Sequence, residues 1–142
     1  MTNKLLGALS RGAWYGAVAI SFYYLSLVGT QYVSIKSSPK ITSQSHLEEI
    51  LDDEMKKAGI DSDIDLKIKL SDDEDEVSHL KRFMDGSYEI ILSPYGSNVS
   101  TLRHELYHLA DGHLDNGHFS LTKYFFWYEP QATIYQLTGL KP

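Results

Sequence analysis

Hydrophobic and polar positions divide this chain into two parts with different patterns. The first part carries no charged residue from Gly12 to Val33. That is about twenty positions, the length that a helix needs to cross a hydrocarbon core. Trp14 and Tyr15 near one end and Tyr32 near the other are typical of residues at membrane surfaces. The pattern predicts a membrane anchor over residues 1–33, with a transmembrane helix at about 12–33.

A cleaved signal peptide is the main alternative, because Lys4 and Arg11 precede the apolar stretch in the expected order. A buried helix of a soluble protein is a third reading. The length of the stretch, its aromatic content and the lack of a clear small-x-small cleavage site favour an uncleaved anchor. Lys36 and Lys40 follow the stretch, but the slight excess of positive charge before it favours a single-pass topology with the body outside the cytoplasm.

The second part of the chain mixes polar and apolar positions and predicts a domain over residues 45–142, joined to the anchor by a polar linker over 34–44. Ser45 is a candidate N-cap for a helix that Gly59 ends. The apolar stripe of this helix comprises Leu47, Ile50, Leu51 and Met55. Strict alternation from Ile64 to Leu70 then predicts a half-buried strand.

A second strand is predicted over Tyr88–Leu92, after the turn-forming pair Asp85-Gly86. Because a helix with candidate metal ligands follows it, we expect this strand to lie at the edge of the sheet and to line a cleft. That helix contains Arg103–Ala110, and Asn98 or Ser100 can cap it.

A last helix is expected near the C-terminus. Pro130 is tolerated in a first helical turn but would kink a helix continuous from Thr122, so we expect the helix to begin near Tyr128. The fold class is therefore α+β: a compact domain with a small sheet, behind an N-terminal transmembrane helix.

Charge and cysteine content limit the functions that this chain can have. The net charge is −6 and the acidic residues all follow residue 40, which argues against general binding of nucleic acid through a basic surface. The absence of cysteine excludes a disulfide framework and every thiolate zinc site. A metal ion would have to be held by histidine and carboxylate side chains.

The strongest chemical signal is His104-Glu105-Leu106-Tyr107-His108. On a helix, positions i and i+4 share one face, so the two imidazoles of His104 and His108 can reach one cation. Glu105 is offset around the helix, where it can address a water molecule instead of the metal. This pattern predicts a zinc site with Glu105 as the general base.

Such a site needs a third protein ligand, and two residues can supply it. His113 would face away on a continuous helix, but Gly112 permits a break. Glu129 opens the last helix, which can pack on the first, and is the better candidate. Four residues are candidates for a hydrogen-bonding donor or a supporting role around the metal: His113, His118, Tyr128 and Tyr135.

These features resemble the gluzincin-type zinc metallopeptidases, especially the ImmA/IrrE family and the minigluzincins. The shared features are the HELxH helix, a histidine five residues after its second histidine, and, after a gap of roughly twenty residues, a glutamate that opens a helix. The resemblance covers roughly residues 45–140. It implies a zincin-like fold, zinc ligands at His104, His108 and Glu129, and a general base at Glu105.

We therefore expect a membrane-anchored zinc metallopeptidase that hydrolyses peptide or protein substrates. One alternative is a non-catalytic, membrane-tethered adaptor or binding protein with a zincin fold. Another is that HELYH is an ordinary amphipathic segment of a small structural membrane protein.

Overall fold

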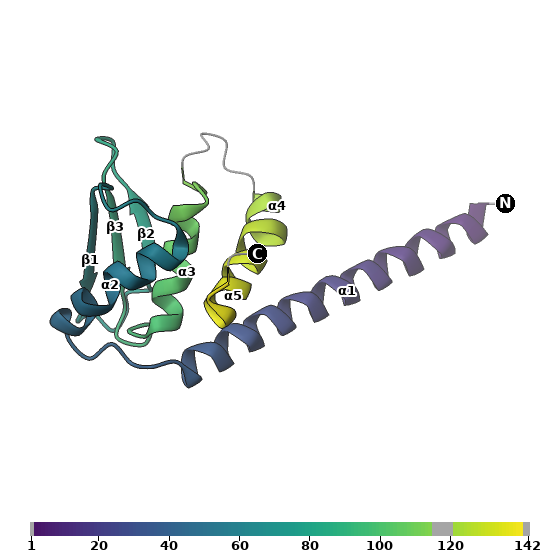
Figure 1. Cartoon of the computed structure of the whole chain (residues 1–142). Coiled ribbons are helices and arrows are strands. Elements are labelled where there is room, and N and C mark those ends of the chain that lie inside the picture. The colour runs from purple at the N-terminus through teal and green to yellow at the C-terminus, as the bar shows by residue number, and fades with distance from the viewer. Residues whose placement is uncertain (1, 115–120, 141–142) are drawn as a thin grey trace.

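The computed structural model describes residues 2–114 and 121–140 (Figure 1). The predicted α+β class is confirmed: a small three-stranded sheet is combined with helices and preceded by one long N-terminal helix. The elements are α1 (Thr2–Ser37), α2 (Gln44–Ala58), β1 (Leu66–Leu70), β2 (His79–Arg82), β3 (Tyr88–Leu92), α3 (Val99–Ala110), α4 (Leu121–Lys123), the π-helical turn η1 (Tyr124–Tyr128) and α5 (Glu129–Thr138).

The sheet has the order β1-β3-β2, with β1 parallel and β2 antiparallel to β3. The expectation that Tyr88–Leu92 is an edge strand is therefore wrong, because β3 is central and β2 is the edge strand beside α3. The sequence of β2, His79-Leu80-Lys81-Arg82, is short and mostly polar, so no alternation predicted it. Ile90 to Leu92 of β3 are buried, as a central strand requires.

Helix α3 lies between the sheet and the α4–α5 segment (Figure 1). Its Leu102 and Leu106 are fully buried. They pack in one core with Leu92 of β3 and with Ala132 and Tyr135 of α5. This packing holds the start of α5 against the middle of α3, where the histidine motif lies.

The helix ends agree in part with the expectations. Asn98 caps α3, since its side-chain oxygen accepts a hydrogen bond from the Thr101 N–H at 2.9 Å. Gly59 ends α2 in the left-handed conformation, with φ of 72°. The N-cap of α2 is Ser43 and not Ser45, so this helix begins at Gln44.

Contrary to expectation, the last helix does not begin near Tyr128 but runs on from Leu121 through η1 into α5. The Glu129 N–H donates to the carbonyl of Tyr124, five residues back, which widens the helix directly before Pro130. The π turn therefore accommodates the proline. It also deprives the Phe125 carbonyl of its usual helical donor, and the hydroxyl of Tyr23 from α1 donates to that carbonyl at 3.4 Å.

Helix α1 is long and apolar enough over Ala13–Ser37 to cross a membrane, as the sequence predicted. By length and composition alone, a signal sequence or a core helix would pass the same test. The polar linker predicted over 34–44 is not a free spacer. Residues 34–37 extend α1, and Ile41 is buried, with its N–H bonded to the Ser97 carbonyl at 2.9 Å.

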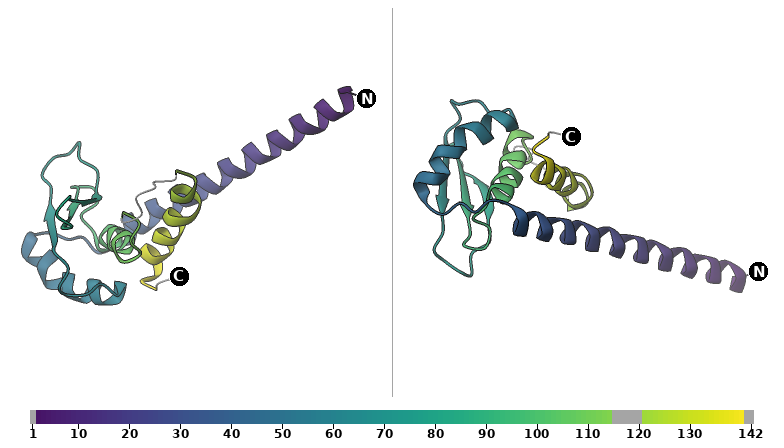
Figure 2. Two further views of the ribbon diagram at one scale, coloured as in Figure 1. Left: turned by 90° about the horizontal axis from the view of Figure 1, so that it is seen from above. Right: turned by 60° about the horizontal axis from the view of Figure 1, so that its bottom comes forward.

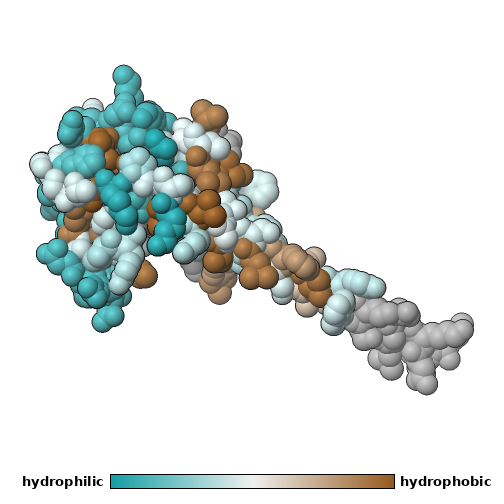
Figure 3. All heavy atoms as spheres, turned by 90° about the horizontal axis from the view of Figure 1, so that it is seen from below, coloured by the Kyte–Doolittle hydropathy of each residue, from teal (hydrophilic) through white to brown (hydrophobic). Residues whose placement is uncertain are grey.

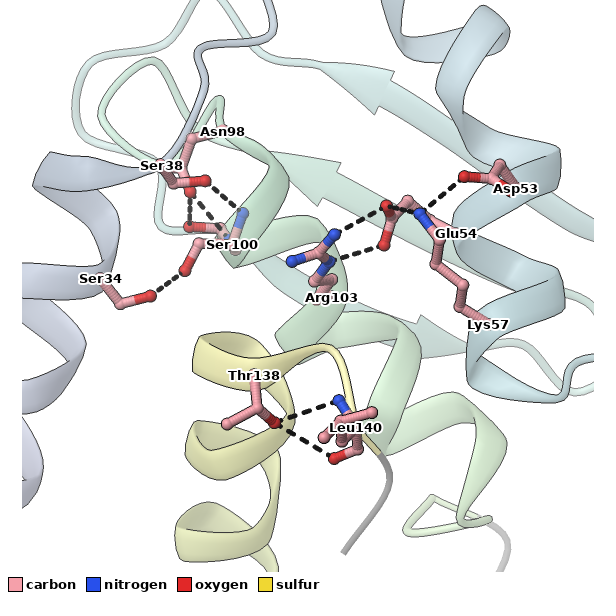
Figure 4. Close-up of polar contacts among 11 residues, drawn as sticks. Ser34, Ser38, Asp53, Glu54, Lys57, Asn98, Ser100, Arg103, Thr138 and Leu140 are labelled. Carbon is pink, nitrogen blue, oxygen red and sulfur yellow. Dashed lines mark hydrogen bonds and ion pairs between the residues drawn. The ribbon is translucent and has the colours of Figure 1, made fainter.

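The C-terminal half of α1 packs on the body, while the rest extends well beyond it (Figure 2). Gln31 Nε2 donates to Thr133 Oγ1 of α5 at 3.1 Å. The hydroxyls of Ser34 and Ser100 are hydrogen-bonded to each other, and the Ser100 N–H donates to Ser38 Oγ at 2.8 Å (Figure 4). These contacts fix the direction in which α1 leaves the domain.

On the opposite side, a partly buried ion pair ties α3 to α2. Arg103 Nε and Nη2 donate to the two carboxylate oxygens of Glu54 at 2.7 and 3.0 Å (Figure 4). Burial by itself would raise the pKa of Glu54, but the hydrogen bonds from Arg103 and Lys57 lower it. The pair positions α3 one residue before the motif histidine His104.

Candidate metal centre

Three side chains from two helices converge on one point. His104 and His108 lie one turn apart on α3, with their Nε2 atoms 3.1 Å from each other. The Glu129 carboxylate at the start of α5 lies 3.5 Å from Nε2 of His104 and 3.4 Å from Nε2 of His108. One nitrogen or oxygen atom of each residue lies within 4.8 Å of those of the others, so the three can share one metal ion.

These separations fit a tetrahedral zinc site. With bonds of about 2.0–2.1 Å, two ligand atoms of a tetrahedron are about 3.3–3.4 Å apart. The three observed separations, 3.1, 3.4 and 3.5 Å, lie around that value. Three protein ligands leave the fourth tetrahedral position for water or substrate, the arrangement of catalytic zinc sites.

The hydrogen-bond partners of His104 fix which ring nitrogen faces this point. Nδ1 of His104 lies 3.0 Å from Gln136 Oε1, an acceptor, so Nδ1 carries the proton. Burial and the neighbouring His108 lower the pKa of His104 to about 4, so the ring is neutral at pH 7. Its Nε2 lone pair is therefore free to bind a cation.

His108 is oriented by a chain of two further side chains. Nε2 of His113 lies 2.9 Å from Asp111 Oδ2, and burial lowers the pKa of His113, so the neutral ring keeps its proton on Nε2. Nδ1 of His113 then accepts from Nδ1 of His108 at 2.6 Å. This leaves the Nε2 lone pair of His108 facing the site. His113 thus lies behind His108, in the place of an orienting partner and not of a ligand.

The charge state of Glu129 completes a set of three acceptors. Burial would raise its pKa, but the nearby His108 and His104 rings and the hydroxyl of Tyr124 lower it to about 2. With the ring protons of His104 and His108 on Nδ1, two imidazole lone pairs and one carboxylate meet at this point. Three such electron-pair donors around one point can bind a cation.

Glu105 lies beside this centre, and only 8% of its surface is exposed. Burial raises the pKa of its carboxyl to about 7, and the Leu80 N–H of β2 donates a hydrogen bond to it. A buried carboxyl with a pKa near the working pH suits a general base.

Two neighbouring cavities lie beside the centre. The smaller, of about 140 Å³, lies over the histidines and is walled by β2 and by Tyr124. The larger, of about 640 Å³, shares Ser78, His104 and Glu105 with it and extends to α1. On the α1 side its wall comprises Gln31, Tyr32, Ile35 and Lys36. The N-terminal helix is therefore part of the cleft wall.

The remaining candidate residues do not reach the centre. Tyr128 stacks on the His113 ring at a centroid distance of 3.9 Å. Tyr135 is fully buried in the core, and its hydroxyl has no hydrogen-bond partner among the described residues. His118 lies outside the described residues.

Gln136, Tyr124 and strand β2 contribute to the site but were not predicted from the sequence. Gln136 lies seven residues after Glu129, two helical turns on, so its place on the same face was predictable. Tyr124 lies before Glu129, and only the π turn directs its hydroxyl to the Glu129 carboxylate. The edge strand β2 had no periodic signal.

Comparison with known proteins adds no relative: no family model matches the chain, and no curated protein and no solved structure matches it either.

Proposed function

We propose that this protein is a zinc-dependent peptidase held at a membrane by α1. The observation that carries the proposal is the convergence of two imidazole lone pairs and the Glu129 carboxylate beside a cavity that both histidines and the buried Glu105 line. Zinc is the preferred ion because this donor set and its separations fit a tetrahedral site with one open position. A purely structural zinc site would be closed by a fourth ligand.

Each residue of the site would have a separate role in peptide hydrolysis. His104, His108 and Glu129 would hold the ion, which when bound would lower the pKa of a water molecule. Glu105 accepts a proton from the attacking water and delivers it to the departing amine. Gln136 and His113 keep the two imidazoles in the required tautomers.

The edge strand β2 supports a peptide as the substrate. A sheet edge presents backbone N–H and C=O groups with which an extended chain can pair. Here β2 forms one wall of the small cavity, beside Glu105 and the two histidines. An extended peptide paired with β2 would pass its carbonyl groups across the metal centre.

Tyr124 is the donor that we assign to the developing oxyanion. Its ring stacks on His108 at a centroid distance of 5.9 Å, and its hydroxyl is bonded to Glu129. Burial and Glu129 raise its pKa, so it stays protonated. We expect Tyr124→Phe to lower kcat by about 10²-fold, the usual effect of losing one such donor, with a smaller effect on KM. An unchanged kcat in steady-state hydrolysis would remove Tyr124 from the mechanism.

The proposal is tested by metal analysis and peptide cleavage on the full chain in detergent. We expect one zinc ion per chain and cleavage of members of a random peptide library, read by mass spectrometry. Removing the metal with a chelator should abolish cleavage, and adding zinc should restore it. Stoichiometric zinc without any cleavage would favour the adaptor reading, and absence of zinc binding would refute the site.

A further inference from the structure

Helices α4 and η1 expose an unusual set of large apolar side chains. The exposed fractions are 62% for Leu121, 41% for Phe125, 47% for Phe126 and 63% for Trp127. We call these four residues the aromatic face. Contiguous apolar surface of this kind on a protein marks contact with another protein or with a membrane. The active site does not use it, because the wall of the small cavity takes only Tyr124 from this segment.

The aromatic face lies directly against α1. The rings of Tyr23 and Phe126 are stacked with a centroid distance of 5.8 Å, and those of Tyr24 and Phe125 meet edge to face at 6.1 Å. The Tyr23 hydroxyl also donates to the Phe125 carbonyl. In the space-filling view, hydrophobic residues gather on the side of the body from which α1 leaves, while hydrophilic residues cover the other end (Figure 3).

The position of these contacts along α1 sets their depth. The candidate span is Ala13–Ser37, 25 residues, whereas a hydrocarbon core needs about 20. Wherever a window of about 20 residues is placed within this span, it contains Tyr23 and Tyr24. Phe125 and Phe126 lie at the level of these tyrosines, so they share the depth of the bilayer.

The polar groups of the segment agree with that depth. Residues 121–128 carry one formal charge, that of Lys123. The Phe125 carbonyl lacks its helical donor and is satisfied by Tyr23, as a carbonyl in a medium without water must be.

We propose that the aromatic face is immersed in the lipid bilayer beside α1, as a second membrane contact. This inference rests on the part of the proposed function that places α1 in a membrane, and not on zinc or catalysis. Immersion holds the larger cavity, one wall of which is α1, next to the membrane. The cleft is then within reach of polypeptide segments that leave the bilayer.

Tryptophan fluorescence tests the proposal, because the chain has two tryptophans, Trp14 and Trp127. The full chain with Trp14→Phe is reconstituted into phosphatidylcholine vesicles with and without lipid brominated in the acyl chains. We expect the brominated lipid to quench the fluorescence of Trp127. The matched control carries Trp14→Phe, Trp127→Phe and Met84→Trp, which moves the sole tryptophan to a fully exposed position in the β2–β3 turn. It should not be quenched.

Flotation of the same vesicles separates the possible failures. Protein that floats with the vesicles but keeps unquenched Trp127 fluorescence overturns immersion and leaves the anchor intact. Trp127 emission that is blue-shifted but unquenched also overturns immersion. In that case a second copy of the chain would cover the aromatic face. Protein that does not float overturns both immersion and the anchor. Zinc content and peptide cleavage, measured separately, decide the peptidase proposal.

Discussion

Replacing Glu105 by glutamine is expected to leave zinc bound and to lower peptide hydrolysis by about 10²–10⁴-fold, the usual contribution of a general base. Glutamine has the same shape, and its amide oxygen can still accept the hydrogen bond from the Leu80 N–H. It cannot accept a proton from water. Zinc content by elemental analysis and kcat/KM for the best library peptide measure the two effects.

The matched control for this variant is Glu49→Gln. Glu49 is an exposed residue of α2 outside both cavities, and its replacement should change neither zinc content nor hydrolysis. If Glu105→Gln hydrolyses peptides at the wild-type rate, the assignment of the base is wrong. If it loses its zinc, Glu105 has a role in holding the ion that the proposed mechanism does not give it.

Replacing Glu129 by glutamine is expected to lower zinc affinity by more than about 100-fold, the upper end of what loss of a supporting partner costs. An amide carries no negative charge, so the site would keep only two imidazoles. Gln136→Ala, which removes the partner of His104, should lower the affinity by only about 10–100-fold. Competition with a zinc-chelating dye measures both constants.

The comparison with His113 distinguishes ligand from orienting partner. If His113 holds the ion, His113→Ala should weaken zinc binding as strongly as Glu129→Gln. We expect instead that Glu129→Gln lowers zinc affinity much more than His113→Ala does. Both ring nitrogens of His113 already have partners, since Nδ1 is hydrogen-bonded to His108 and Nε2 to Asp111. The reverse order would contradict the assignment of Glu129.

Local sequence patterns predicted the elements that form for local reasons. Alternation gave β1, and the isoleucine-rich Tyr88–Leu92 gave β3. The side chain of Asn98 and the conformational freedom of Gly59 gave the ends of two helices. The edge strand β2 was not predicted from the sequence. Its four mostly polar residues form a strand only because β3 supplies the hydrogen-bond partners.

The proline prediction failed for a related reason. Pro130 breaks a regular α-helix, and nothing in the local pattern revealed that a π turn would precede it. The stacking of η1 against Tyr23 and the donor that Tyr23 supplies to Phe125 come from a segment about a hundred residues earlier. Contacts at that sequence separation leave no periodic signal.

The sequence by itself determined that two histidines share one face of a helix with a glutamate beside them, because helical geometry makes residues four apart neighbours. It also determined one apolar helix long enough to cross a membrane, because length and hydropathy are local properties. Only the tertiary structure decided that Glu129 meets both histidines while His113 lies behind one of them. That choice depends on how α5 packs on α3, since the core around Leu106 and Tyr135 sets which side chains meet.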